Sequence, residues 1–497
     1  MGRTITEAEA GVLVGLGGGE RLALRLDRAN RHGLVAGATG TGKTVTLQIL
    51  AQGLSDAGVP VFAADVKGDL SGVAMAGSPN EKLLARAAKM DLDLPSLAAP
   101  TVFWDLFGEQ GHPIRATVSE VGPLLLSRML ELNDVQEGVL TVAFRVADEE
   151  GLLLLDLKDL QAVLGFVSEN AADISARYGA VAKTSLAAIR RKLLVLEDQG
   201  AAGFFGEPAL ALSDLMRVDG SGRGHVNILA ADRLINSPRL YATFLLWLLS
   251  ELFEELPEVG DPEKPRLAFF FDEAHLLFRD APRGLLEKVE QVVRLIRSKG
   301  VGVYFVTQNP ADIPDSVLGQ LGNRIQHALR AYTPADQKGL RAAAQSFRTN
   351  PDFDTAEAIQ GLGVGEALVS LLDEKGAPCV VQKTLIRPPA SRLGPATPAE
   401  RDALMAQSPV RGLYDKTLDR ESAHEMLQRR AQAAAAPARP PARGASAPSA
   451  PTSRRSSGGG SNRQGLGEAF TKSVLRTVGS QIGREIVRGV LGGLRRR

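Results

Sequence analysis

The apolar positions in the N-terminal part of the chain predict short strands around one early helix. Apolar runs at 12–16 and 22–26 flank three glycines, which is typical of two strands joined by a tight turn. A run at 34–36 precedes a helical stretch from Val45 to Leu54, and a further run at 59–65 follows that stretch. Strand, helix and strand within about thirty residues predict a right-handed crossover in a parallel sheet.

The pattern changes to helical spacing between about Val118 and Arg217. We therefore expect a helical insertion at 117–220 that divides an α/β core into two parts, 1–116 and 221–390. Further strands are expected at 101–105, 226–231, 267–271, 303–308, 323–325, 367–371 and 379–385, and helices at 238–255, with Trp247 and Phe253 in the core, and at 285–299.

The C-terminal part has three segments of different composition. We expect a helical extension at 391–430 and a disordered linker at 431–465, because the Ala-, Pro-, Ser-, Gly- and Arg-rich linker cannot bury enough apolar area to fold. In the segment 466–497 apolar residues recur at every fourth position from Leu466 to Leu494. Because four exceeds the 3.6 residues of a helical turn, the stripe winds around a basic amphipathic helix. Such a helix could serve oligomerisation, a protein partner, a membrane surface or nucleic acid, and a loosely ordered tail is the alternative.

The charged residues are divided unevenly along the chain. Residues 431–497 carry twelve Lys or Arg and two acids, which leaves 46 basic and 55 acidic residues of the totals of 58 and 57 for the first 430. A nucleic-acid-binding protein with an acidic body must gather its positive groups in a groove, a pore or a tail. The net charge of +1 therefore gives no argument for DNA.

Cysteine usage and hydropathy indicate the compartment. The single cysteine, Cys379, excludes an internal disulfide framework and a Cys-rich metal site, and we expect it to be a small buried residue. Met1–Ala10 carries charges where a signal peptide would need an apolar run, and no run of about eighteen apolar residues occurs. We therefore expect a globular protein of the cytoplasm.

The strongest chemical signal is the octapeptide Gly37-Ala38-Thr39-Gly40-Thr41-Gly42-Lys43-Thr44 between a predicted strand and a predicted helix. Its glycines allow consecutive backbone N–H groups to surround phosphate oxygens, and the helix that follows directs its positive end at the same anion. Lys43 adds a charge, and the Thr44 hydroxyl can reach a magnesium ion that bridges the outer phosphates. The sequence therefore predicts a phosphate-binding loop.

A second signal is the pair of carboxylates after the apolar run 267–271. The carboxyl ends of parallel strands meet at the edge where the phosphate loop lies, so Asp272 is placed to hold the magnesium ion through water. Glu273 is placed to polarise the water that attacks the γ-phosphate. His275 could couple to this site or pack as a structural histidine. Residues 65–69 end another strand at this edge and are either part of the ligand site or an ordinary loop.

Four further polar residues are candidates for a contact with the nucleotide. Arg294 and Arg297 end the helix at 285–299, where they could form a solvated face or reach the nucleotide of a neighbouring subunit. Gln308 ends a strand and could sense the γ-phosphate. Arg324 could reach the nucleotide of its own subunit or make a surface ion pair.

In combination, these motifs make the chain resemble the HerA and FtsK group of P-loop ATPases, and most closely a bacterial HerA-like family of unknown function. The resemblance covers about residues 10–390 and rests on Gly37–Thr44, Phe271–His275, Arg294–Gly300, Thr307–Pro310 and Asn323–Arg324. The archaeal relatives carry an N-terminal β-barrel for which too few residues precede the phosphate loop, and the membrane-spanning segments of the DNA pumps have no counterpart.

The resemblance implies an α/β fold with a RecA-like P-loop NTPase core, a mostly parallel sheet, the helical insertion and a flexible C-terminal extension. It implies ATP and Mg²⁺ as cofactors. It assigns Lys43, Thr44, Asp272 and Glu273 to hydrolysis, Gln308 to sensing, and Arg297 or Arg294 to a finger supplied in trans.

By resemblance we expect a hexameric ring that translocates on or unwinds double-stranded DNA. The alternative is a nucleotide-gated assembly or scaffold ATPase that acts on a protein or membrane partner through 466–497.

Overall fold

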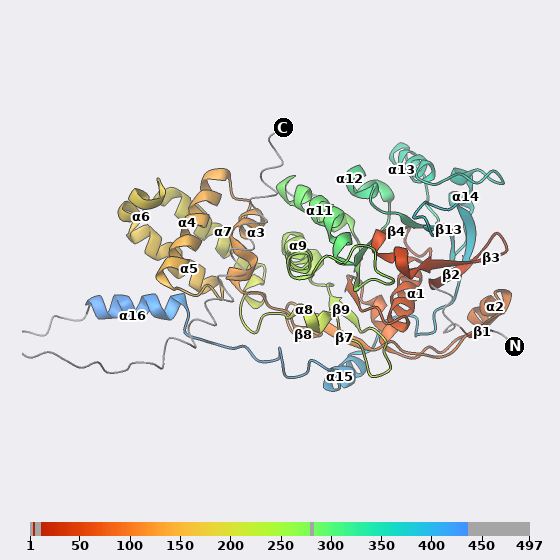
Figure 1. Cartoon of the computed structure of the whole chain (residues 1–497), viewed down its shortest axis with the longest axis horizontal. Coiled ribbons are helices and arrows are strands. Elements are labelled where there is room, and N and C mark those ends of the chain that lie inside the picture. Colours follow the sequence, from red (N-terminus) through yellow and green to blue (C-terminus); the bar gives the residue numbers. More distant parts are fainter. Residues whose placement is uncertain (1–2, 5–10, 279–282, 436–497) are drawn as a thin grey trace, which may run out of the picture. The chain divides into compact units, whose positions relative to one another are not determined.

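The computed structural model describes residues 3–4, 11–278 and 283–435 (Figure 1). Residues 1–431 form one compact unit, and residues 432–497 form a second unit that is described only as far as residue 435. Helix α16 (Ala423–Ala435) continues into the first residues of the predicted linker. The rest of that linker and the basic amphipathic helix at 466–497 lie outside the described residues and stay predictions.

The described strands form a main sheet in the order β3-β2-β14-β13-β12-β4-β11-β10-β5-β9-β7-β8. From β12 to β8 every neighbouring pair is parallel. The bounds of these strands are β12 (Asn323–Gln326), β4 (Gly33–Ala36), β11 (Val301–Thr307), β10 (Leu267–Phe271), β5 (Val61–Asp65), β9 (Val226–Ala230), β7 (Thr101–Asp105) and β8 (His112–Pro113). The predicted mostly parallel sheet is confirmed.

The other end of the sheet is antiparallel. It consists of β13 (Glu366–Ser370), β14 (Gln382–Ile386), β2 (Gly11–Gly17) and β3 (Glu20–Arg25). The strands predicted around the glycine turn are β2 and β3. The short strands β1 (Arg3–Thr4) and β6 (Leu92–Asp93) pair with each other outside this sheet.

The central strands are buried on both faces because helices cover both sides of the sheet (Figure 1). Successive side chains of β10 point to opposite faces. Phe269 and Phe271 belong to the apolar cluster that includes α9 (Pro238–Glu255) and α11 (Arg283–Ile296). Ala268 and Phe270 belong to the cluster that includes α1 (Lys43–Asp56). A continuous apolar run is thus what a strand between two helical layers requires.

The helical spacing predicted after Val118 is confirmed by α3 (Val118–Met129), α4 (Asp134–Glu150), α5 (Leu157–Glu169), α6 (Ala171–Tyr178), α7 (Lys183–Asp198) and α8 (Leu212–Leu215). Helix α3 starts with a capping box, in which the Thr117 and Glu120 side chains each accept a hydrogen bond from the backbone N–H of the other residue. One apolar cluster runs from these helices to the sheet face under α9. The helical segment is therefore packed continuously onto the core.

Six more α-helices of the described residues lie around the core and its C-terminal extension. They are α2 (Glu81–Lys89), α10 (His275–Phe278), α12 (Asp315–Leu318), α13 (Pro334–Gln345), α14 (Thr355–Gly361) and α15 (Pro398–Ala406). Helix α15 is anchored by Arg401, whose guanidinium lies 4.6 Å from the ring centre of Phe103 in β7. The extension at 391–430 is thus partly helical and packs on the sheet edge.

Two expectations about side chains have different outcomes. Trp247 is buried and Phe253 packs against the same core, as expected. The expectation for Cys379 is wrong, because this thiol is exposed. Strand β14 begins only at Gln382, three residues later than predicted, so Cys379 lies in the connection from β13 rather than inside the sheet. The residue type of Cys379 therefore did not predict its burial, because the position lies between β13 and β14 and not inside a strand.

His32 makes the stability of the core dependent on pH. Its Nδ1 accepts a hydrogen bond from the Val303 N–H at 3.0 Å, so its Nε2 carries the proton that is donated to the Val293 carbonyl oxygen at 2.8 Å. Burial lowers the pKa of His32 from 6.5 to about 4. This stabilisation is therefore fully present above pH 6.5 and is lost as the pH falls toward 4.

We expect His32→Gln to remove this pH dependence, because glutamine does not titrate. Between pH 7 and pH 5 the wild-type free energy of unfolding should fall by about 2 kcal/mol more than that of the variant. Urea denaturation at the two pH values measures this difference. Equal losses in the two proteins would show that His32 is not the titrating group.

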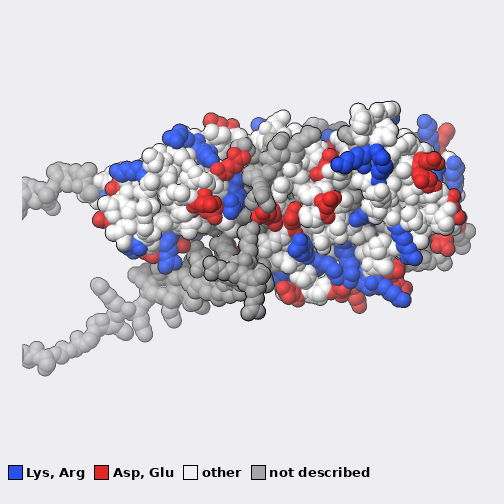
Figure 2. Space-filling view, turned by 90° about the horizontal axis from the view of Figure 1, so that it is seen from above, with Lys and Arg blue, Asp and Glu red and all other residues white. Residues whose placement is uncertain are grey.

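The surface carries charges of both signs. In the view of Figure 2, Lys and Arg side chains are interspersed with Asp and Glu over the visible face. None of the described helices is long and apolar enough to cross a membrane.

Candidate active site

The predicted phosphate loop joins the end of β4 to the start of α1, the context that the motif requires. Gly37, Gly40 and Gly42 have φ angles of 152°, 77° and 116°, in the region that favours glycine. A Cβ atom on Gly37 would lie 2.5 Å from the Cβ of His327. The loop is thus held close to the neighbouring strand, and the N-terminus of a long helix forms one side of it.

Lys43 is folded back over the loop. Its Nζ donates hydrogen bonds to the carbonyl oxygens of Gly37, at 2.5 Å, and Ala38, at 3.1 Å. Lys43 is only 8% exposed, and burial lowers its pKa. The charges of Glu273 and Asp272 raise the pKa but do not outweigh the effect of burial. The ammonium group therefore lies where phosphate oxygens could replace the two carbonyl groups.

Behind the loop, His327 connects α1 to the sheet. Its Nε2 lies 2.9 Å from the Thr46 hydroxyl, and its Nδ1 lies 2.9 Å from the Glu366 carbonyl oxygen. Burial lowers the pKa of His327 to about 4, so the ring is neutral at physiological pH. The Gly365 N–H also donates to the Thr41 carbonyl oxygen at 3.0 Å. These contacts fix the loop from the side of β12 and β13, and the sequence pattern gave no sign of them.

Asp272 and Glu273 follow β10 directly, at the edge of the sheet that carries the phosphate loop. The Glu273 backbone N–H donates to Asp272 Oδ1 at 2.9 Å. Burial, followed by the charge of Glu273, raises the pKa of Asp272 to about 6. Asp65, at the end of the neighbouring β5, is buried, and burial together with the charge of Asp272 raises its pKa to about 7. The two aspartates are thus buried carboxyl groups that ionise less readily than usual.

Glu273 is 4% exposed and has a φ angle of 48°, which is uncommon for a residue other than glycine. Its carboxylate forms an ion pair with Lys67. The Gln308 side-chain amide donates to the same carboxylate, at 3.2 Å to Oε2. Burial raises the pKa of Glu273, but the hydrogen bond and charge of Lys67 outweigh it, so the pKa is lowered. His275 Nδ1 lies 3.3 Å from Oε2.

The structure thus brings together most of the residues that the sequence singled out. Gln308 contacts Glu273, and Lys43 lies within range of the charges of both Glu273 and Asp272. The sequence analysis did not identify Lys67 as a partner of Glu273. The available signal was its position in the segment 65–69, directly after a buried strand of the same sheet edge.

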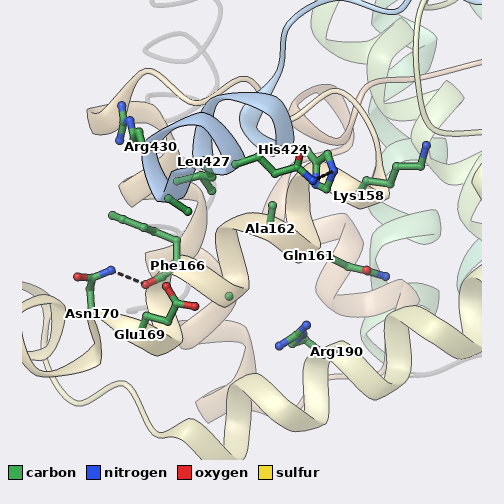
Figure 3. Close-up of a pocket in the computed structure, with 13 residues that line it drawn as sticks. Lys158, Gln161, Ala162, Phe166, Glu169, Asn170, Arg190, His424, Leu427 and Arg430 are labelled. Atoms are coloured by element: carbon green, nitrogen blue, oxygen red, sulfur yellow. Dashed lines mark hydrogen bonds between the residues drawn. The ribbon is translucent and has the colours of Figure 1, made fainter. Parts of the chain in front are cut away.

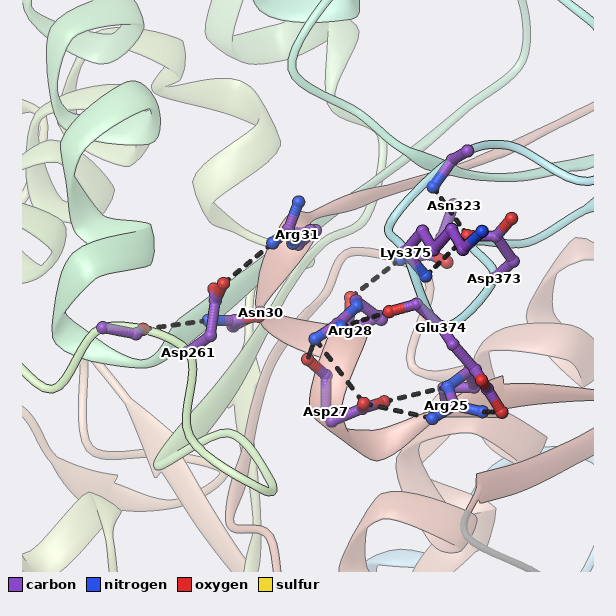
Figure 4. A network of polar contacts seen from close by, with 12 residues as sticks. Arg25, Asp27, Arg28, Asn30, Arg31, Asp261, Asn323, Asp373, Glu374 and Lys375 are labelled. Carbon is purple, nitrogen blue, oxygen red and sulfur yellow. Dashed lines mark hydrogen bonds and ion pairs between the residues drawn. The ribbon is translucent and has the colours of Figure 1, made fainter.

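Arg297 and Arg294 lie at the opposite edge of the sheet. Arg297 begins the short 3-10 turn Arg297–Lys299 that leads into β11, and the far end of β11 meets the phosphate loop. Its Nη2 donates to Asp261 Oδ1 at 3.0 Å, and Arg31 pairs with Asp261 Oδ2 at 2.8 Å in the polar network of Figure 4. Arg294 is exposed in the last turn of α11. Neither arginine reaches the phosphate loop of its own chain. Either one could therefore contact only a nucleotide that is bound to a neighbouring subunit.

Arg324 is not directed at the phosphate loop. Its guanidinium donates to the carbonyl oxygens of Leu318, Leu321 and Ser346 at 2.8–3.0 Å. The alternative reading, a surface ion pair, does not describe these contacts either, because the partners of the guanidinium are carbonyl oxygens. Arg324 thus connects β12 to the segments around Leu318 and Ser346, and its contact with the nucleotide stays a prediction.

A pocket of about 550 Å³ lies elsewhere, in the helical segment (Figure 3). It is lined by side chains of α5, α7 and α16, among them Lys158, Arg190, His424 and Arg430. None of the predicted site residues lines this pocket. The candidate active site is therefore the sheet edge around Lys43 and Glu273.

Comparison with known proteins assigns the chain to a family. The model of the family "Helicase HerA-like C-terminal" matches residues 16–497. The DNA double-strand break repair helicase HerA of Sulfolobus acidocaldarius is 22% identical over 360 residues, which are 71% of this chain and 65% of that protein. The chain spans less than two thirds of the length of the curated relatives it matches.

Solved structures share the fold. The bacterial conjugative coupling protein TrwB has a TM-score of 0.51 at 15% identity, over 78% of this chain and 93% of that chain. TrwB in complex with a non-hydrolysable ATP analogue has a TM-score of 0.51 at 17% identity, over 79% and 93%. The predicted RecA-like fold is thus confirmed. The family expected from the combination of motifs is also confirmed, and the chain belongs to the helicase HerA-like C-terminal family.

Proposed function

We propose that this protein is a Mg²⁺-dependent ATPase that works as a HerA-like translocase or helicase on double-stranded DNA. The observation that carries the proposal is the position of Glu273 beside Asp272, at the sheet edge that holds Lys43 and the phosphate loop. ATP bound there would supply the γ-phosphoryl group, and Mg²⁺ would neutralise the charge of the phosphates.

The residues present fit this pair of ligands. The loop has room for phosphate at Gly40, where an added Cβ atom would meet nothing within 4 Å, whereas Gly37 lies against His327. Thr44 and Asp272 would hold Mg²⁺ on the protein side. Burial, followed by the charge of a neighbouring carboxylate, raises the pKa values of Asp272 and Asp65, and this fits a nearby cation because a divalent charge would stabilise their ionised forms.

Glu273 would take the proton of the attacking water, and Gln308, which already contacts it, would respond to the γ-phosphate. Arg297 or Arg294 would complete the site of a neighbouring subunit. Their position at the opposite edge of the sheet supports this role, because the head-to-tail contacts of a ring can bring that edge to the next phosphate loop. We propose a hexamer on the same grounds, in the cytoplasm, where a single cysteine would remain reduced.

The DNA substrate is supported by the relatives, which are named as DNA repair helicases. We expect duplex DNA to stimulate the ATPase, and we expect this stimulation to weaken steeply with salt. If only three phosphates are neutralised, a fourfold rise in salt lowers the DNA affinity about fortyfold. The measurement is the ATPase rate with and without duplex DNA at 50 and 200 mM salt, with Glu273→Gln as the blank.

A nucleotide-gated assembly or scaffold ATPase is the second candidate. The observation in its favour is the basic composition of residues 431–497, which suits an acidic protein surface or a membrane as well as DNA. An ATPase rate that is the same with and without DNA would contradict the translocase and favour this candidate.

A further inference from the structure

Lys67 is the unexpected member of the site. It follows β5, and β5 pairs with β10, with Ala64 opposite Phe271. This register places the segments after the two strands side by side, so the ammonium group of Lys67 reaches the Glu273 carboxylate. The Lys67 side chain is 42% exposed, whereas that of Glu273 is 5% exposed. A half-exposed lysine thus covers a buried carboxylate.

In this arrangement both oxygens of Glu273 are engaged. Lys67 pairs with Oε1, and the Gln308 amide lies 3.4 Å from Oε1 and 3.2 Å from Oε2. A general base must direct a free lone pair at the water that it deprotonates. An ionised carboxylate has about four lone pairs, so these contacts leave some of them open. Burial raises the pKa of Glu273, but the ammonium group of Lys67 lowers it, so Glu273 becomes a stronger base when Lys67 leaves.

Lys67 is the partner that can leave. Both partners are exposed side chains that follow buried strands, β11 for Gln308 and β5 for Lys67. Lys67 differs because it carries a positive charge that a phosphate attracts, and because it precedes Gly68, which has a φ angle of 78°. Lys43 feels the charges of Glu273, Lys67 and Asp272, so the two lysines belong to one charged cluster. Lys43 is buried over the loop itself, which leaves Lys67 as the exposed cation of this cluster.

A triphosphate would offer Lys67 a stronger partner than Glu273. The γ-phosphate carries more negative charge than one carboxylate and accepts several hydrogen bonds, and an ammonium group on a flexible stem can reorient toward it. A nucleoside diphosphate lacks this group and leaves the pair with Glu273 as the better contact.

We propose that Lys67 is a γ-phosphate-binding residue that exchanges Glu273 for the phosphate when a triphosphate binds. The exchange frees the carboxylate of Glu273 only when a γ-phosphate is in place. This inference rests on the proposed ATPase function. It adds that binding of the γ-phosphate by Lys67 releases the Glu273 carboxylate for catalysis.

The test is the ratio of the affinities for a non-hydrolysable ATP analogue and for ADP, both measured with Mg²⁺ by titration calorimetry. In Lys67→Met the affinity for the analogue should fall roughly ten- to a hundredfold, the effect of one charged hydrogen bond. The affinity for ADP should stay within about twofold. Lys67→Arg should retain most of the preference, and Lys183→Met, at an exposed lysine of α7, should match the wild type.

A second comparison separates a direct contact from simple repulsion, because removal of Lys67 also leaves Glu273 without its counter-charge. In the background Glu273→Gln that repulsion is absent. The double variant Lys67→Met, Glu273→Gln should still lose the preference for the ATP analogue relative to Glu273→Gln alone. An equal preference in these two proteins would overturn the proposal, as would an unchanged ratio in a folded Lys67→Met protein.

Failure of the ATPase proposal gives a different result. In that case the wild-type protein would not bind the ATP analogue. A wild type that binds the analogue and hydrolyses ATP, with a ratio unaffected by Lys67→Met, would keep the ATPase and reject only the role of Lys67.

Discussion

Glu273→Gln should lower the rate of ATP hydrolysis by about 10²- to 10⁴-fold while ATP still binds. The amide has the shape of the carboxylate but cannot accept a proton from water. The phosphate cradle, made of the loop glycines and Lys43, is left intact. Phosphate release measures turnover, and calorimetry with ATP and Mg²⁺ measures binding.

The matched control for this variant is Glu258→Gln, which removes an exposed carboxylate from the connection between α9 and β10. It should hydrolyse ATP at the wild-type rate. If Glu273→Gln does so too, Glu273 is not the base.

Arg297→Ala and Lys43→Ala should each abolish ATP hydrolysis when present in every subunit. Loss of an arginine finger lowers the rate by about 10³- to 10⁵-fold. When the two variants are mixed, a site with intact Lys43 from one subunit can meet an intact Arg297 from its neighbour. Random mixing in equal amounts makes about a quarter of the interfaces of a head-to-tail ring complete, so about a quarter of the wild-type rate should return.

The control for the mixing experiment is Arg324→Ala with Lys43→Ala. Arg324 binds carbonyl oxygens of its own chain, so its replacement should affect stability and not the completion of sites between subunits. No recovery on mixing Arg297→Ala with Lys43→Ala would reject Arg297 as the finger, and the same experiment with Arg294→Ala would then test the other candidate.

Most of the fold could be predicted because its signals are local. The apolar run 267–271 could only be a buried strand, and the glycines of residues 37–44 require a strand before them and a helix after them. The order of β4, β11, β10 and β5 does not follow from such signals. It depends on which strands pair across the sheet.

The candidate site divides in the same way. The sequence by itself determined the phosphate loop and the two carboxylates, because each motif is a short segment whose backbone positions its own side chains. Only the tertiary structure decided what these groups contact. Lys67 reaches Glu273 because β5 and β10 are neighbours, and His327 supports the loop because β12 lies beside β4. Likewise, Cys379 is exposed because the rim of a sheet lacks a covering layer, so its burial could not be read from its residue type.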